Sequence, residues 1–138
     1  MPLFTLPLTK WRTAGTMGEA LRWISMKKSV LIVEDDPIIA QAMARLVEDD
    51  LGCSTETAGS VAGAMALLDA DVGFGILDVE VSDGVSYPLA EELAHRHIPF
   101  IFVSGSDPRQ VPADLAGAPF FRKPMFPDHF LQVVRPYV

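Results

Sequence analysis

Short, continuous apolar runs that alternate with helical patterns are the feature of this sequence that most restricts its fold. Three such runs lie at residues 30–33 (VLIV), 74–79 (FGILDV) and 99–105 (PFIFVSG), and two weaker ones at 53–58 and 119–124. Apolar residues without alternation are typical of strands that are buried on both faces. We therefore predict an α/β fold, a doubly wound five-stranded parallel sheet with helices on both faces.

The segments between these runs carry helical signals. Helical spacing of apolar residues predicts helices at 37–50, 61–68, 87–96 and 128–134. Asp36 and Ser60 stand where a side chain can cap the first two of these helices. The segment 104–118, between the last two strands, carries two prolines and little periodicity. We expect the fourth helix of the fold to be short or missing there.

Length and charge limit the domain count and the partners. The chain has 138 residues, of which 49% are hydrophobic, and this is enough for one compact domain. A net charge of −7 and the lack of a basic patch argue against nucleic-acid binding. The single cysteine, Cys53, cannot form an internal disulfide, which fits a reducing, cytoplasmic compartment. We find no apolar stretch long enough to span a membrane and no signal peptide, so no membrane partner is expected.

The first 26 residues stand apart from the alternating pattern. We divide the chain into an N-terminal extension, 1–26, and one domain, 27–138. Residues 16–25 (TMGEALRWIS) are consistent with a short amphipathic helix, with Thr16 as its cap and Glu19 as the capping-box partner. This helix would either dock on the domain or bind a partner.

Polar residues follow the apolar runs at the carboxyl end of four predicted strands. Glu34 and Asp35 end the first strand, Asp78 the third, Ser104 the fourth and Lys123 the fifth. In a doubly wound sheet, these ends meet at the edge where ligands bind. Carboxylates held close together repel each other unless a cation neutralises them, and oxygen ligands with room for water suit Mg²⁺. We therefore predict a Mg²⁺ site at this edge.

These motifs together resemble the receiver domain of two-component response regulators, which has the flavodoxin-like fold of CheY-like proteins. The resemblance covers residue 27 to the C-terminus and rests on LIVEDDP, ILDV, FVSG and FRKP, in that order. Each motif alone is weak, but their order, with the acidic pair ending 43 residues before Asp78, makes the set specific.

The resemblance implies a role for each matching residue. Asp78 would be the nucleophile that accepts a phosphoryl group from a sensor histidine kinase or a phosphotransfer protein. Mg²⁺ would be held by Glu34, Asp35, Asp78 and the backbone carbonyl of Glu80.

Further roles concern the phosphoryl group and the switch. Ser104 and Lys123 would each bind a phosphoryl oxygen. Ser104 and Phe120 would form the switch, with Phe120 at the place of an aromatic residue that is commonly Tyr. The peptide bond between Lys123 and Pro124 would be cis.

The segment 78–105 is also similar to the FAT-GUY single-domain receivers of alphaproteobacteria, which share a Pro in the third helix region and a reduced fourth helix. FVSGSD replaces the usual signature of that subgroup. We expect a stand-alone regulator, a monomer or weak dimer, that signals to a downstream protein target or shuttles phosphate. It would be modified once per signal and would not act as an enzyme.

Two alternatives use the same residues differently. A receiver-like module that has lost phosphorylation would bind protein alone. A phosphatase of the haloacid dehalogenase type would use DVEVS, 78–82, as its nucleophile loop. However, that loop normally follows the first strand and requires an Asp where Glu80 stands, so this alternative is the weaker one.

Overall fold

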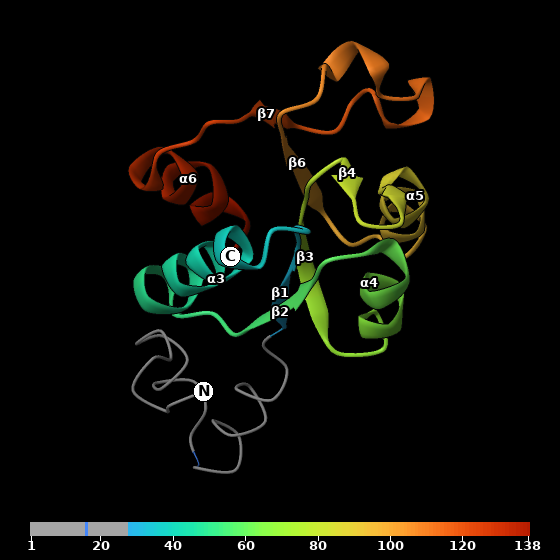
Figure 1. The fold of residues 1–138 in the computed structure, drawn as a ribbon. Coiled ribbons are helices and arrows are strands. Elements are labelled where there is room, and N and C mark those ends of the chain that lie inside the picture. The colour runs from blue at the N-terminus through green and yellow to red at the C-terminus, as the bar shows by residue number, and fades with distance from the viewer. Residues whose placement is uncertain (1–15, 17–27) are drawn as a thin grey trace.

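A computed structural model describes residue 16 and residues 28–138. The predicted extension and its helix therefore lie outside the described residues, apart from Thr16, and stay a prediction. The described chain forms a five-stranded parallel sheet in the order β2-β1-β3-β6-β7. Figure 1 shows α3 and α6 on one side of this sheet and α4 and α5 on the other. The predicted doubly wound α/β architecture is confirmed.

The strands of the main sheet lie close to the predicted runs. They are β1 (Ser29–Val33), β2 (Thr55–Ala58), β3 (Val72–Leu77), β6 (Phe100–Ser104) and β7 (Phe120–Arg122). The largest difference is in β3, which begins two residues before the predicted range and ends at Leu77. Asp78 therefore lies just beyond the strand, where its side chain is not committed to either face of the sheet.

The four α-helices of the described residues also match the prediction. They are α3 (Pro37–Leu51), α4 (Val61–Leu67), α5 (Tyr87–His95) and α6 (Pro127–Val134). Asp36 Oδ1 accepts hydrogen bonds from the backbone N–H groups of Ile38 and Ile39, at 2.9 and 3.4 Å. Ser60 Oγ accepts one from Gly63 N–H at 2.9 Å. Both predicted caps are confirmed. No helix among the described residues is long and apolar enough to cross a bilayer.

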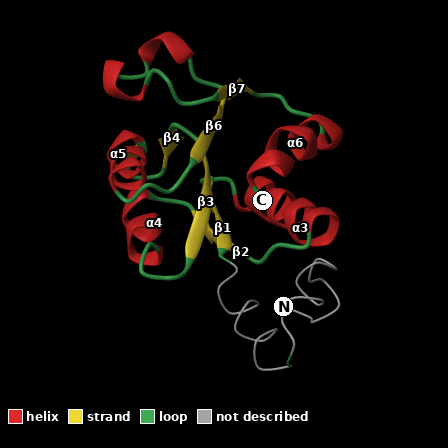
Figure 2. Cartoon of the chain, turned by 180° about the vertical axis from the view of Figure 1, so that it is seen from behind, coloured by secondary structure: helices red, strands yellow, loops and turns green. Residues whose placement is uncertain are grey.

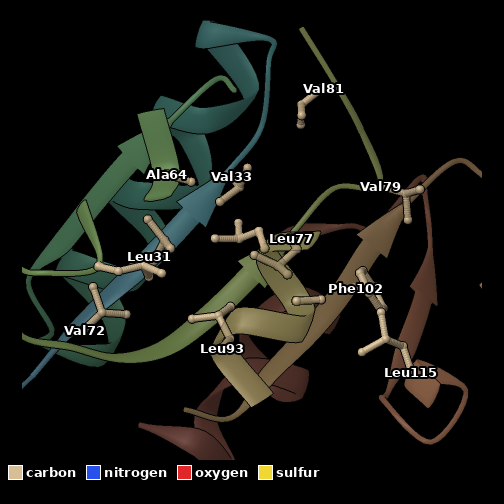
Figure 3. Close-up of a cluster of buried hydrophobic side chains, with 13 residues drawn as sticks. Leu31, Val33, Ala64, Val72, Leu77, Val79, Val81, Leu93, Phe102 and Leu115 are labelled. Atoms are coloured by element: carbon tan, nitrogen blue, oxygen red, sulfur yellow. The ribbon is translucent and has the colours of Figure 1, made fainter. Parts of the chain in front are cut away.

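Two cores hold the helices to the sheet. Neighbouring residues of one strand point to opposite faces, as a pleated strand requires. Leu31 and Leu77 therefore pack in the core beneath α4 and α5, which Figure 3 shows. Ile32 and Ile76 pack in the opposite core, beneath α3 and α6. This explains why the strand sequences are continuously apolar.

The connection between β6 and β7 contains no regular α-helix. It has two 3₁₀ turns, η2 (Pro108–Gln110) and η3 (Ala113–Leu115), and Leu115 is buried in the core under α5. Figure 2 shows this connection at the top of the molecule. The prediction of a reduced fourth helix is confirmed.

Two elements were not predicted, a small second sheet and a C-terminal 3₁₀ turn, η4 (Arg135–Tyr137). A two-stranded antiparallel hairpin, β4 (Glu80–Val81) and β5 (Gly84–Val85), follows Asp78 directly. Gly84 has a φ of 134°, a backbone conformation that residues other than glycine adopt only at a cost in free energy. The hairpin lies between β3 and α5, beside the edge where the predicted site residues meet.

Candidate functional site

The sheet register brings the predicted site residues together. Val33, the last residue of β1, pairs with Leu77 in β3, and Ser104 in β6 pairs with Arg122 in β7. The residues that follow these pairs are therefore neighbours. Asp78 N–H donates to Val33 C=O at 2.9 Å, and Lys123 N–H donates to Ser104 C=O at 3.0 Å.

The Asp78 carboxylate is bound on both oxygens. Ser104 Oγ donates to Asp78 Oδ1 at 2.7 Å, and Lys123 Nζ donates to Asp78 Oδ2 at 2.9 Å. Lys123 Nζ also contacts both carboxylate oxygens of Glu34, at 3.1 and 3.0 Å. The ammonium group thus pairs with two carboxylates at once. The Glu34 and Asp78 side chains are only 3% and 12% exposed, so both charges depend on this compensation.

Glu34 and Asp78 differ in their pKa, although both side chains are largely buried. Burial raises the pKa of Glu34 from 4.5 to about 7, and the hydrogen bond with Asp78 adds to the rise, against the lowering effect of Lys123. Burial also opposes ionisation of Asp78, but hydrogen bonds with Glu34, Lys123 and Ser104 outweigh it and lower its pKa below 3.8. Asp78 is therefore an ionised carboxylate at neutral pH, as a nucleophile must be.

The pKa of Lys123 is also set by two opposing effects. Burial lowers the pKa of the Lys123 ammonium, but the hydrogen bonds to Asp78 and Glu34 outweigh this effect and raise it above 10.5. The positive charge at the site is therefore permanent at physiological pH. A second cation would compete with it for the same carboxylate oxygens.

The acids form a set that could hold a metal ion. Ligand atoms of Glu34, Asp35 and Asp78 all lie within 4.8 Å of one another. Asp35 and Asp78 border an open polar cavity of about 360 Å³, which is also lined by Glu80, Ser104, Gly105 and Ser106. A hard oxygen donor set with an open, polar side fits Mg²⁺, which keeps several of its waters. Asp36 is not in this set, because its carboxylate caps α3.

Comparison with known proteins identifies the family. No profile of a known family and no curated protein matches the chain. Solved structures do match. SdrG from Sphingomonas melonis Fr1 is 33% identical, with a TM-score of 0.65 over 79% of this chain and 94% of that one. A response regulator receiver protein from Burkholderia phymatum is 26% identical, with a TM-score of 0.67 over 80% and 94%.

The chain belongs to the CheY-like receiver domains of response regulators. A further structure of the same fold is the response regulator protein TrrA from Thermotoga maritima, in complex with Mg²⁺-BeF. It is 18% identical, with a TM-score of 0.68 over 80% of this chain and 99% of that one.

The two residues predicted to form the switch, Ser104 and Phe120, lie on the adjacent strands β6 and β7. Phe120 is half-buried, and its ring centroid lies 5.8 Å from that of Phe102 in β6. Tyr87, at the start of α5, packs edge-on against the same Phe102 ring at 6.0 Å. The predicted cis peptide bond between Lys123 and Pro124 is present.

Several residues beside the receiver site were missed by the sequence reasoning. Ser86 is fully buried, and its Oγ donates to the backbone carbonyl of Asp78 at 2.6 Å. Asp83, in the hairpin turn, accepts hydrogen bonds from the first two N–H groups of α4. The Asp83-Gly84 dipeptide was the available signal, since Asp-Gly between apolar residues is typical of a hairpin turn. For Ser86, no local pattern indicates its partner.

Proposed function

We propose that this receiver accepts one phosphoryl group on Asp78 from a sensor histidine kinase or a phosphotransfer protein, with Mg²⁺ as its cofactor. One observation carries the proposal. The ionised Asp78 carboxylate, bonded by Ser104 at 2.7 Å and Lys123 at 2.9 Å, borders the open polar cavity. A carboxylate nucleophile beside a hydroxyl and an ammonium donor suits attack on phosphorus.

The proposed role of each site residue follows from its charge and its hydrogen bonds. Asp78 supplies the attacking oxygen, and its low pKa keeps this oxygen unprotonated. Ser104 and Lys123 already donate to the Asp78 oxygens, so they stand within reach of a phosphoryl group attached there. Bound Mg²⁺, held by Glu34, Asp35, Asp78 and the Glu80 backbone carbonyl, would neutralise charge on the acids and on the phosphoryl group.

A nearby apolar groove supports a protein donor. The groove has a volume of about 530 Å³ and lies between α3 and the segment that leads from β7 into α6. Ile38 and Met125 line it, as does Lys123 of the site itself. Ile38 is 79% exposed, which is unusual for a large apolar side chain unless a partner covers it. We propose that the donor protein docks here and thereby presents its phosphohistidine to Asp78.

The output is proposed to pass through Ser104 and Phe120. When Ser104 turns from Asp78 to a phosphoryl oxygen, the space beside the half-buried Phe120 ring changes. A downstream protein would read this change, or the phosphoryl group would be shuttled onward. The 3₁₀ turns in place of a fourth helix favour membership in the FAT-GUY subgroup. We place this signalling in the cytoplasm, in keeping with the single cysteine Cys53.

Intact-mass spectrometry after incubation with acetyl phosphate and Mg²⁺ tests the proposal. We expect one phosphoryl adduct per chain, which is lost in Asp78→Asn and after chelation of Mg²⁺. Because the chain is proposed to be a phosphoacceptor and not a turnover enzyme, acetyl phosphate consumption should stay close to stoichiometric over minutes. An adduct that persists in Asp78→Asn, or rapid multiple turnover, would contradict the proposal.

A further inference from the structure

The hairpin that follows Asp78 is hydrogen-bonded to the start of α4 and to the loop before it. Asp83, in its turn, accepts hydrogen bonds from Val61 N–H at 2.7 Å and from Ala62 N–H at 3.1 Å, both in the first turn of α4. Ser82 adds two bonds to the loop before α4: its N–H and its Oγ both donate to Gly59 C=O, at 3.2 and 2.9 Å. Ser82 and Asp83 thus hold the hairpin turn against the start of α4.

These bonds do more than cap α4, because they also join it to a distant segment of the chain. Ser60 already caps the helix from within its own segment, through Gly63 N–H at 2.9 Å. Asp83 comes 22 residues later in the chain and is exposed, so it adds a link between two segments and not a first cap. The hydrogen bonds from the backbone of Val61 and Ala62 lower the pKa of Asp83, so its carboxylate is charged and bonded at neutral pH.

The loop before α4, which the Ser82-Asp83 turn holds, contacts the acidic pair. A Cβ placed on Gly59 would lie 3.6 Å from Asp35 Cα and 3.7 Å from Glu34 O, so this glycine is in contact with the backbone that carries two of the site acids. Ser82 therefore links the hairpin turn to Gly59 and the acidic pair, and Asp83 holds the start of α4 two residues further along the chain.

The other end of the hairpin is fixed to the phosphoacceptor. Ser86 Oγ donates to Asp78 C=O at 2.6 Å, and Ser86 N–H donates to Val79 C=O at 2.8 Å. Val81 anchors the hairpin from below, with its side chain in the core cluster shown in Figure 3. Glu80 lies between these fixed points and lines the polar cavity.

We propose that Asp83 is a positioning residue that sets the separation between Glu80 and the Glu34-Asp35 pair, and so prepares the receiver for Mg²⁺. The proposal rests on the function proposed above, because it assigns the Glu80 carbonyl to the metal. Asp83 touches neither the metal nor the phosphoryl group. It acts through the hairpin, whose two strands pair with each other over only two residues each.

Calorimetric titration of Mg²⁺ into the full chain tests this with three variants. Asp83→Ala removes the link, and we expect it to weaken Mg²⁺ binding about tenfold, as is usual for groups that orient a metal ligand. Asp83→Asn keeps one acceptor oxygen, enough for the shorter bond from Val61 N–H, and should bind within about threefold of the wild type, because Asn and Asp cap helices equally well. Ser60→Ala removes the other cap of α4 and should lower the thermal midpoint while leaving Mg²⁺ affinity unchanged.

Each contrary outcome overturns the proposal. Unchanged Mg²⁺ affinity in Asp83→Ala would show that the link does not position the site. Equal losses in Asp83→Asn and Asp83→Ala would show that charge is what matters. An equal loss in Ser60→Ala would trace the effect to the start of α4. A wild type that binds no Mg²⁺ would end this proposal, whereas one that binds Mg²⁺ but accepts no phosphoryl group would contradict only the proposed function.

Discussion

Replacement of Glu34 by glutamine should stabilise the metal-free protein at alkaline pH, although it removes a residue of the site. Glu34 is 4% exposed, and burial raises its pKa to about 7 from 4.5. An acid with a raised pKa in the folded state binds its proton more tightly there than in the unfolded chain. The stability that the proton provides is complete below pH 4.5 and is lost as the pH rises through about 7.

The size of the effect follows from the two pKa values. The interval from 4.5 to about 7 corresponds to about 3 kcal/mol of unfolding free energy at a pH above both values. Glutamine cannot ionise and has nearly the same shape, so it avoids this loss. Its amide forms weaker contacts with Lys123 than a carboxylate does, and we therefore expect a net gain of about 1 to 3 kcal/mol at pH 8.5.

Urea unfolding followed by circular dichroism, in a chelating buffer, measures this gain. Wild type and Glu34→Gln should differ most at pH 8.5 and converge as the pH is lowered to 5, with equal urea dependence in both. Added Mg²⁺ should stabilise the wild type more than the variant. A variant that is less stable than the wild type at pH 8.5 would refute the reasoning, since the ionised Glu34 would then stabilise the fold.

Three further predictions concern the metal, the groove and the core. The apparent Mg²⁺ affinity should rise as the pH is raised from about 6 to 8, with release of close to one proton from Glu34, measurable by titration calorimetry in buffers of different ionisation enthalpy. Ile38→Asp should slow phosphoryl transfer from a protein donor about tenfold while leaving acetyl phosphate labelling unchanged, because the protein donor contacts the groove and acetyl phosphate does not. Phe102→Ala should cost about 3 to 5 kcal/mol in urea unfolding, since the ring is fully buried between Phe100, Tyr87 and Phe120.

The features that could be predicted from the sequence are those that follow from a simple physical rule for strands, helix ends or parallel sheets. Continuous apolar runs gave the strands because buried parallel strands need both faces apolar. Asp36 and Ser60 predicted the starts of two helices because a polar side chain at this position can satisfy the first free N–H groups. The convergence of Glu34, Asp78, Ser104 and Lys123 followed from the rule that the carboxyl ends of parallel strands share one edge.

What was missed either is too short to show a sequence pattern or depends on contacts that no local pattern indicates. The hairpin strands Glu80–Val81 and Gly84–Val85 are two residues each, too short for any period to show. The partner of Ser86 is a backbone carbonyl, which leaves no trace in the sequence. Likewise, the hydrogen bond of Lys123 to Glu34, 89 residues away, forms only when the sheet has brought β1 and β7 together. Sequence reasoning placed Lys123 at the phosphoryl group and did not predict that it would hold both acids in the metal-free state.

The central claim is that Asp78 is the residue that receives the phosphoryl group, and chemical trapping of the product tests it most directly. Protein treated with acetyl phosphate and Mg²⁺ would be reduced with sodium borohydride, which converts an aspartyl phosphate to homoserine, and then digested and sequenced by mass spectrometry. The account predicts homoserine at position 78 in the wild type, and none in Asp78→Asn or after chelation of Mg²⁺. Homoserine at Asp35 or at another acid, with Asp78 intact, would contradict it.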